Sequence, residues 1–237
     1  EYLATAMAAQ CMLWQTSPAA TELETRMLDW LRQAVGLPDT FTGVIQDSAS
    51  TATLAAVLTM RERALAWAGN QEGLTGQPRL RVYASDQNHS SIDRAVWISG
   101  IGAENLVRIP VSGSLRGMDP EALDAAIAQD HAAGFLPAGV IACVGATGIG
   151  ATDNVRAVCE VAQRHDLMTH VDAAWAGSAM ICPEFRHLWD GIELADSVVF
   201  NPHKWLGAQF DCSAHYLKHP ADLLRTLAIH PDYLATH

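Results

Sequence analysis

The fold is decided by one stretch, Ser197-Val198-Val199-Phe200-Asn201-Pro202-His203-Lys204-Trp205. Its first four residues form an apolar run that ends abruptly in Asn-Pro. A run of this kind cut by an X-Pro step predicts a buried strand that delivers its last residues into a turn. We therefore expect Lys204 at the carboxyl end of a strand. There its amine could attack an aldehyde, although a single lysine after a strand is more often an ordinary surface residue.

A second stretch, Thr169-His170-Val171-Asp172-Ala173-Ala174-Trp175, places a carboxylate at the end of another expected strand. Sites for pyridoxal 5′-phosphate (PLP) combine a lysine that forms a Schiff base with an acid that faces the pyridine nitrogen. The pair formed by Lys204 and Asp172 therefore indicates PLP as a candidate cofactor.

Strand and helix patterns alternate outward from these two stretches. Strands are expected at Gly43–Gln46, Leu80–Ala84, Leu106–Pro110, Val140–Val144, Met168–Val171, Ser197–Phe200 and Cys212–Leu217. Helices are expected from Pro18 to about Gly36, from about Ser50 to Trp67, and at Ser91–Ile98, Pro120–Ala132 and Asn154–His165, with an exposed loop from Gly69 to Pro78. The alternation predicts an α/β fold with right-handed crossovers and a mainly parallel sheet. The last strand follows Lys204 too closely for a crossover helix, so we expect it to be antiparallel.

The amino-acid composition limits which classes of protein this chain can belong to. Of the 237 residues, 49% are hydrophobic and 17% are charged, a balance that suits a sheet covered on both faces. A formal net charge of −11 argues against a nucleic-acid partner, because phosphate contacts need clustered Lys and Arg. No apolar run reaches membrane-spanning length, and no His or Cys cluster suggests a metal site.

The five cysteines are scattered without a C-x-x-C pair, and we interpret them as reduced core thiols of a cytoplasmic protein. The chain starts inside an apolar helical pattern that includes Leu3, Met7, Cys11 and Trp14, and it stops at residues 234–237 without a closing element. We therefore expect residues 1–237 to be one domain of a longer subunit.

In an open parallel sheet, ligands bind outside the carboxyl ends of the strands. Polar residues follow five of the expected strands: Ser48 and Ser50, His89, Thr147, Asp172, and Asn201 with Lys204. The small residues of 47–51 open a helix whose free amides could bind a phosphate, although plain helix capping is the more usual reason for such residues. His89 could stack on an aromatic cofactor or transfer a proton, and the alternative is a structural loop histidine.

One rival pattern is Gly148-x-Gly150 after a strand, with Asp172 ending the next strand. It imitates the dinucleotide fingerprint, in which an acid about 20 residues onward binds the ribose. The third fingerprint glycine would be Asp153, whose carboxylate would repel a pyrophosphate. A nicotinamide-dependent dehydrogenase and a purely structural glycine turn are the alternatives to PLP chemistry here.

Four runs resemble the group II PLP-dependent decarboxylases, and most closely the aromatic-L-amino-acid decarboxylases. They are VIQDSASTATL (44–54), SDQNHSSIDRA (85–95), HVDAAWAGSAMICPEFRHL (170–188) and FNPHKWL (200–206). The resemblance covers nearly the whole chain. It implies a large domain of the aminotransferase type, fold type I, with a seven-stranded, mostly parallel sheet, one antiparallel strand and helices on both faces.

The resemblance also implies a role for each matching position. Lys204 would bind PLP covalently, Asp172 would pair with the pyridine nitrogen, and His89 would stack on the ring opposite Ala174. Thr147 would lie beside the cofactor and His89. The residues implied around the phosphate are Ala49, Ser50, Asn201 and His203.

Two positions depart from the family pattern. Ala146 stands where the family usually has a threonine, and Trp175 where it usually has a tyrosine. The family's amino-terminal arm, its catalytic loop with a tyrosine, and its small carboxyl-terminal domain are missing from residues 1–237. The resemblance further implies a homodimer with a shared active site.

These observations predict a PLP-dependent L-amino-acid decarboxylase (a carboxy-lyase) that prefers aromatic substrates and releases an amine and CO₂, with Lys204, Asp172 and His89 as the catalytic residues. The open alternatives on the same scaffold are an acidic-amino-acid decarboxylase and an aldehyde synthase. From other classes, the alternatives are the dehydrogenase and an inactive interaction subunit.

Overall fold

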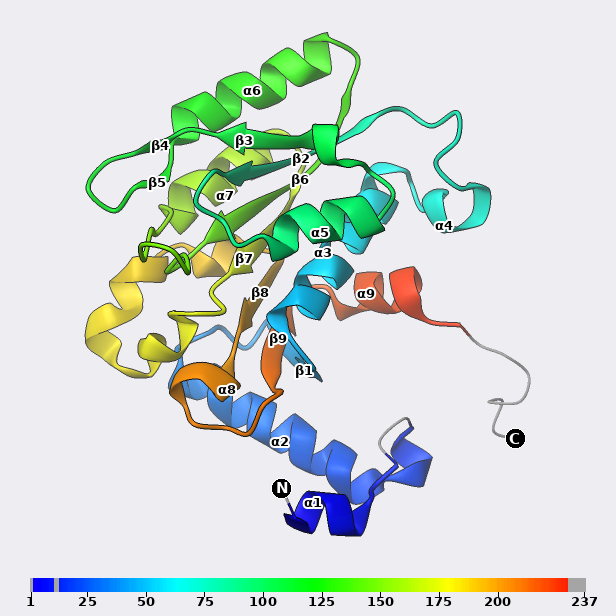
Figure 1. Ribbon diagram of the computed structural model, residues 1–237, viewed down its shortest axis with the longest axis vertical. Helices are drawn as coiled ribbons and strands as arrows, with labels where there is room; N and C mark the ends of the chain where they lie inside the picture. Colours follow the sequence, from blue (N-terminus) through cyan, green and yellow to red (C-terminus); the bar gives the residue numbers. More distant parts are fainter. Residues whose placement is uncertain (1, 11–12, 230–237) are drawn as a thin grey trace.

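The computed structural model describes residues 2–10 and 13–229, so Cys11 and the carboxyl-terminal residues 230–237 lie outside the described residues. Seven strands form one sheet in the order β1-β9-β8-β7-β6-β2-β3 (Figure 1). Their bounds are β1 Thr42–Gln46, β2 Leu80–Ser85, β3 Leu106–Ile109, β6 Leu136–Cys143, β7 Met168–Asp172, β8 Ser197–Phe200 and β9 Ser213–Leu217. Only β9 runs antiparallel to its neighbours, β1 and β8, which confirms the mostly parallel sheet with one antiparallel strand.

Nine α-helices lie in the described part of the chain. They are α1 Tyr2–Met7, α2 Pro18–Ala34, α3 Ala49–Ala64, α4 Gly69–Glu72, α5 Ser91–Ile98, α6 Pro120–Ala132, α7 Val155–Arg164, α8 Pro202–Trp205 and α9 Pro220–Leu227. Short 3₁₀ helices occupy Trp14–Thr16 (η1), Ala103–Asn105 (η2), Gly177–Ile181 (η3), Pro183–Trp189 (η4) and Ile192–Leu194 (η5).

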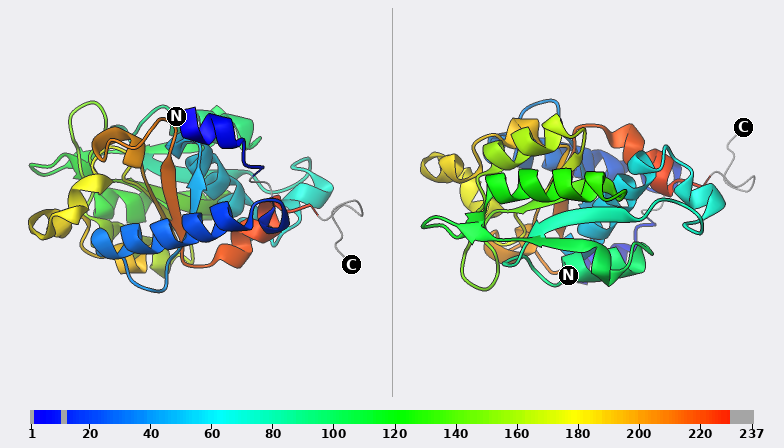
Figure 2. Two further views of the ribbon diagram at one scale, coloured as in Figure 1. Left: turned by 90° about the horizontal axis from the view of Figure 1, so that it is seen from below. Right: turned by 90° about the horizontal axis from the view of Figure 1, so that it is seen from above.

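The helices cover both faces of the sheet, as Figure 2 shows. On one face, α6, α7 and α2 pack against the inward side chains of the central strands, with Val158 and Tyr216 fully buried. On the other face, α3 and α5 enclose a second cluster that includes Val57 and Met60. Burial of apolar surface on both faces explains why the strands read as continuous hydrophobic runs.

Several boundaries differ from the sequence expectations. β6 begins at Leu136, four residues before the expected start, because Pro137 and Gly139 weaken the strand signal there. α3 ends at Ala64 rather than near Trp67, and the expected loop at 69–78 begins with the one-turn helix α4. The small hairpin of β4 (Val111–Ser112) and β5 (Gly117–Met118) was not predicted, since two-residue strands carry no periodicity.

The cysteines are only partly core residues. Cys143 and Cys159 are buried, whereas Cys182 is exposed and Cys212 is half-buried, and all four are free thiols. The prediction of core thiols is therefore wrong for Cys182 and Cys212, which lie in loops at the ends of elements rather than inside them. Among the described residues, no helix is long and apolar enough to cross a membrane.

Candidate functional site

Five strand ends meet at one hollow of about 270 Å³ on the carboxyl edge of the sheet. The segments that follow β1, β2, β6, β7 and β8 all contribute to its wall. Every site residue expected from the sequence lines it: Ala49, Ser50, His89, Thr147, Asp172, Ala174, Asn201, His203 and Lys204. The structure thus brings all of these positions together, while the role of each one stays a prediction.

Lys204 lies in the single turn α8, drawn in orange in Figure 1, directly after β8. Pro202 opens this turn, where its missing N–H costs nothing, and the Lys204 amide donates to the Asn201 carbonyl at 3.0 Å. The half-buried side chain reaches into the hollow. Its Nζ lies 5.6 Å from the centre of the Trp175 ring.

Asp172 is the last residue of β7 and is only 5% exposed. One carboxylate oxygen accepts the Ala174 N–H at 3.0 Å. Burial raises the pKa of the Asp172 carboxyl, while that hydrogen bond and the nearby Lys204 and His89 act in the opposite direction. A buried carboxylate of this kind is stabilised by a cation placed next to it.

The amino terminus of α3 borders the hollow through Ala49 and Ser50. Ser48 caps the helix, because its Oγ accepts the Thr51 N–H at 3.2 Å. The first N–H groups of a helix have no partner within the helix, and the dipole makes this end partly positive. This end of a sixteen-residue helix therefore offers both donors and charge to an anion.

Asn201 and His203 place two donors face to face. Nδ1 of His203 accepts the Cys212 N–H at 2.8 Å, so a neutral imidazole carries its proton on Nε2. Burial and the adjacent Lys204 lower the pKa of His203, which favours that neutral form. Nε2 lies 3.2 Å from Nδ2 of Asn201, whose Oδ1 accepts the Ser213 hydroxyl at 2.7 Å. The facing Nε2–H and Nδ2–H groups need a shared acceptor, such as an anionic oxygen.

His89 is held at the start of α5. Its Nδ1 accepts the Ser91 N–H at 3.1 Å and lies 2.9 Å from the Ser91 hydroxyl, which leaves Nε2 as the N–H donor of a neutral ring. Thr147 is exposed on the rim, and Ala174 is 9% exposed on the wall.

The sequence analysis did not single out four residues of the hollow: Ser91, Cys143, Gly145 and Phe210. Ser91 could have been found from its position two residues after His89, at a helix start. Cys143 ends β6, but the expected strand extended past it to Val144. Phe210 lies in the loop before β9, and its ring centre is 4.7 Å from that of His203, with the two rings tilted against each other. No pattern in the neighbouring sequence predicts this contact.

Asp153 explains why the dinucleotide pattern fails. Its two carboxylate oxygens accept the N–H groups of Met118 and Cys143, each at 2.6 Å, and the side chain is buried. It therefore joins the hairpin of β4 and β5 to the end of β6. Burial raises the pKa of Asp153 to about 6.

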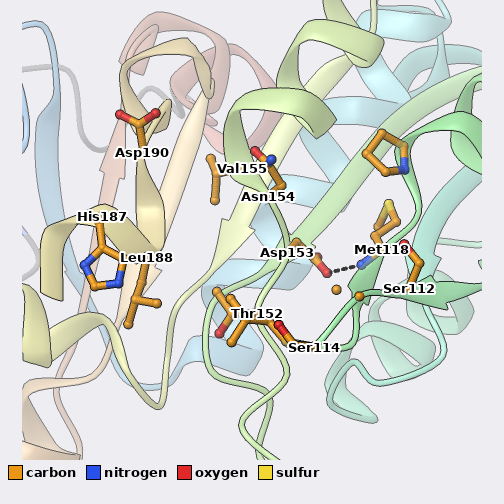
Figure 3. A pocket seen from close by; sticks show the side chains of 14 residues that line it. Ser112, Ser114, Met118, Thr152, Asp153, Asn154, Val155, His187, Leu188 and Asp190 are labelled. Carbon is orange, nitrogen blue, oxygen red and sulfur yellow. Dashed lines mark hydrogen bonds between the residues drawn. The ribbon is translucent and has the colours of Figure 1, made fainter.

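A separate hollow of about 500 Å³ opens beside this hairpin. Figure 3 shows Asp153 pointing toward Met118, with His187 and Asp190 on the opposite side of Asp153. Its lining contains no Lys or Arg, so it offers no amine to an aldehyde cofactor. Within residues 2–10 and 13–229, no cluster of three or more His, Cys, Asp or Glu side chains could hold a metal ion.

Comparison with known proteins agrees with this geometry. Residues 1–237 match the family model described as the pyridoxal-dependent decarboxylase conserved domain. The chain belongs to this family. The aromatic-L-amino-acid decarboxylase of Sus scrofa is 45% identical over 93% of the chain and 47% of its own length. The phenylacetaldehyde synthase of Petunia hybrida is 40% identical over 93% of the chain and 44% of its own length.

Among solved structures, Oryza sativa TDC with PLP and tryptamine superimposes with a TM-score of 0.94 at 42% identity. The match covers 100% of this chain and 50% of that one. The chain therefore spans about half the length of the relatives that it matches.

The residues of the hollow fit the family's cofactor. The Lys204 amine can react with the cofactor's aldehyde, and a cation would stabilise the buried Asp172 carboxylate. The N–H donors of Asn201 and His203, together with the α3 amino terminus, can bind an anion. PLP carries an aldehyde, a protonatable ring nitrogen and a phosphate, so each group has a partner of matching chemistry.

Proposed function

We propose that this chain forms the cofactor-binding half of a PLP-dependent L-amino-acid decarboxylase that acts on aromatic substrates and releases an amine and CO₂. The observation that carries the proposal is the meeting of Lys204, the buried Asp172 and the facing donors of Asn201 and His203 in one hollow. The family membership and the aromatic substrates in the relatives' names support it.

In this proposal, Lys204 anchors the cofactor through its amine. Asn201, His203, Ala49 and Ser50 bind the phosphate with side-chain and amide N–H groups. Bound PLP supplies an electron sink for the pair left when the substrate loses its carboxylate.

Asp172 holds a proton on the ring nitrogen, because a buried anion beside that nitrogen raises the pyridine pKa. His89 and Ala174, whose side chain is a single methyl, would hold the ring between them. With its Nδ1 engaged by Ser91, His89 directs an N–H donor from Nε2 into the hollow and can orient the substrate carboxylate. Thr147 lies at the rim beside His89.

An aldehyde synthase is the second candidate, because the Petunia hybrida synthase is 40% identical. The full-length protein should be incubated with phenylalanine, tyrosine, tryptophan, glutamate and cysteine sulfinate. CO₂ with an equal amount of aromatic amine supports the decarboxylase. Aldehyde in place of the amine supports the synthase, and turnover of only the acidic substrates refutes the aromatic assignment.

The anchor can be tested through the chain's low lysine content, since residues 1–237 contain only Lys204 and Lys218. Lys218 Nζ donates to the Glu193 carbonyl at 2.7 Å and does not line the hollow. Borohydride reduction of the full-length holoenzyme should fix PLP to Lys204. The adduct should vanish in Lys204→Ala and persist in Lys218→Ala. An adduct on any other lysine would reject the assignment.

We further propose that residues 1–237 are the PLP-binding large domain of a longer subunit, and that the full protein is a homodimer with a shared active site. The chain's share of its relatives' length supports the first point. Exposed apolar residues at the amino terminus, such as Leu3 and Met7, support the second. The free thiols of the described cysteines support a cytoplasmic location.

A further inference from the structure

The Lys204 amine lies beside Trp175, which in turn contacts a second tryptophan. Its Nζ is 5.6 Å from the centre of the Trp175 ring, inside the distance of about 6 Å at which a cation is attracted to an aromatic face. Trp205, the next residue after Lys204, meets Trp175 edge-on, with ring centres 5.7 Å apart and planes at 86°. The two rings come from different strand ends, one after β7 and one after β8.

The Trp175 ring is the group that contacts the Lys204 ammonium. Among the described residues, no carboxylate forms an ion pair with Lys204 and no acceptor takes a hydrogen bond from its Nζ. Asp172 acts on Lys204 only through longer-range attraction. Trp175 is 43% exposed, so the contact lies at the open side of the hollow rather than on its floor.

A PLP lysine must exist in two states, because the substrate amine replaces it on the cofactor and it returns at the end of the cycle. A free lysine side chain has four rotatable bonds and would otherwise scatter through the space that the substrate needs. A cation–π contact suits this task, because it is weak enough to be reversed in each cycle. Tryptophan offers the most attractive ring for a cation, which gives a physical meaning to the departure from tyrosine at this position.

We propose that Trp175, braced by Trp205, is a positioning residue that holds the Lys204 ammonium over its indole ring whenever Lys204 is not bonded to the cofactor. The proposal rests on the proposed function only in taking Lys204 as the cofactor anchor. In this proposal, the two tryptophans determine where the Lys204 side chain lies when it is not bonded to the cofactor. They do not bind the cofactor's ring or its phosphate.

The test uses the full-length protein with lysine labelled by ¹³C at the ε carbon. The Lys204 signal is assigned by its loss in Lys204→Arg, and the Lys218 signal by its loss in Lys218→Arg. Protons above an aromatic ring are shifted upfield, so in cofactor-free protein the Lys204 ε-CH₂ signal should lie upfield of that of Lys218. The upfield signal should disappear when PLP binds and should return when the product amine saturates the holoenzyme.

Four variants separate the contributions. Trp175→Leu should bring the Lys204 signal to the position of Lys218, and Trp175→Phe should keep a smaller upfield shift. Trp205→Leu should reduce the shift, because the brace is lost while the ring remains. Trp97→Leu, which removes a 57% exposed tryptophan on α5, is the matched control and should change nothing.

An unshifted Lys204 signal in wild-type protein, or a shift that survives Trp175→Leu, would overturn the proposal. If the upfield shift is lost in Trp205→Leu but fully kept in Trp175→Leu, the ammonium contacts the Trp205 ring instead of the Trp175 ring. That result would also overturn the proposal. Borohydride trapping of the same wild-type preparation tests the anchor separately. A missing Lys204 adduct refutes the anchor, whereas a Lys204 adduct without an upfield signal refutes only the role of Trp175.

Discussion

At the residue scale, the site depends on charges that the protein holds in place before any ligand arrives. Asp172 is the clearest case, because its carboxyl group is 5% exposed and accepts one backbone hydrogen bond, and no cationic side chain of the described residues forms an ion pair with it. Burial of the Asp172 carboxylate is unfavourable because it removes water from a charged group. A protonated ring nitrogen next to the carboxylate would offset this desolvation free energy.

Asp172→Asn should therefore separate binding from reaction. The amide keeps the shape of the side chain but cannot hold the proton on the ring nitrogen. We expect the variant to retain PLP and to lose turnover by about 100-fold or more, the range found when one preorganised electrostatic group is removed. Absorbance of the bound cofactor and kcat should be measured together, and near-normal kcat would contradict the pairing.

Asp153 should make stability depend on pH. Its pKa is about 6 in the folded protein and near 3.8 when solvated, so the folded state binds the proton more tightly. The stabilisation from this group is fully present below pH 3.8 and is lost as pH rises through 6. The free energy of unfolding should thus fall over that window by an amount on the order of 3 kcal/mol from this group.

The matched variant is Asp153→Asn, which cannot titrate and turns an amide N–H toward one of the two backbone donors. Urea unfolding at several pH values between 4 and 7.5 should show wild type losing its advantage over the variant as pH rises. A constant difference across this range would contradict the assignment.

The sequence predicted which strand ends meet at the hollow through residues whose identity alone suggests chemistry, such as Lys204 and Asp172, while their roles stay predictions. It could not predict residues whose role depends on distant partners. Asp153 was noticed only as a misfit in a glycine pattern, because its partners Met118 and Cys143 are brought to it by the hairpin and by β6. The facing donors of Asn201 and His203 likewise depend on the position of Cys212 in the folded chain.

At the element scale, α3 connects the sequence pattern to anion binding. Ser48 both caps the helix and lines the hollow. The cap fixes the first turn, so the free amides of that turn point at the proposed phosphate.

Ser48→Ala should lower the free energy of unfolding by about 1 kcal/mol through loss of the cap and should also weaken PLP binding. Asn154→Ala is the control, since Asn154 caps α7 by accepting the Ala157 N–H at 3.1 Å, away from the hollow that holds Lys204. It should cost similar stability without changing PLP affinity. Urea midpoints and PLP titration by absorbance measure the two effects, and equal affinity in both variants would argue against a phosphate at α3.

Elements with a clear periodic pattern, apolar run or end signal were predictable. α5, α6 and β8 have the expected bounds. Elements without a pattern were not predictable, including the 3₁₀ helices between Gly177 and Leu194 and the β4–β5 hairpin. Their conformation is decided by packing, for example of the buried Trp189, rather than by local preference.

At the scale of the whole molecule, the amino-terminal residues leave apolar surface uncovered. In α1, Tyr2, Leu3 and Met7 are 93%, 80% and 78% exposed, and Trp14 in η1 is 55% exposed. Such a cluster is typical of a surface that another chain or segment covers.

We therefore expect the full-length protein to be a tight dimer whose dissociated subunits are inactive. Light scattering and activity should be measured over one dilution series, and activity should fall where the mass falls to that of one subunit. Replacing Leu3 and Met7 by Ser should move both transitions to higher concentration. Full activity in a species with the mass of one subunit would refute the shared site.

The position of β9 has a consequence for how the chain assembles. Among the strands that the structure describes, β1 pairs only with β9, in a register that sets Thr42 opposite Leu217, so the first strand of this sheet pairs with the last one along the sequence. During synthesis, β6, β7 and β8 can pair in succession, but β1 keeps an open edge until β9 emerges. Pairings so distant in sequence slow folding and expose unpaired edges to aggregation. Within this sheet, β9 is thus the last strand to be synthesised and paired, and the edge of β1 stays open to wrong pairings until then.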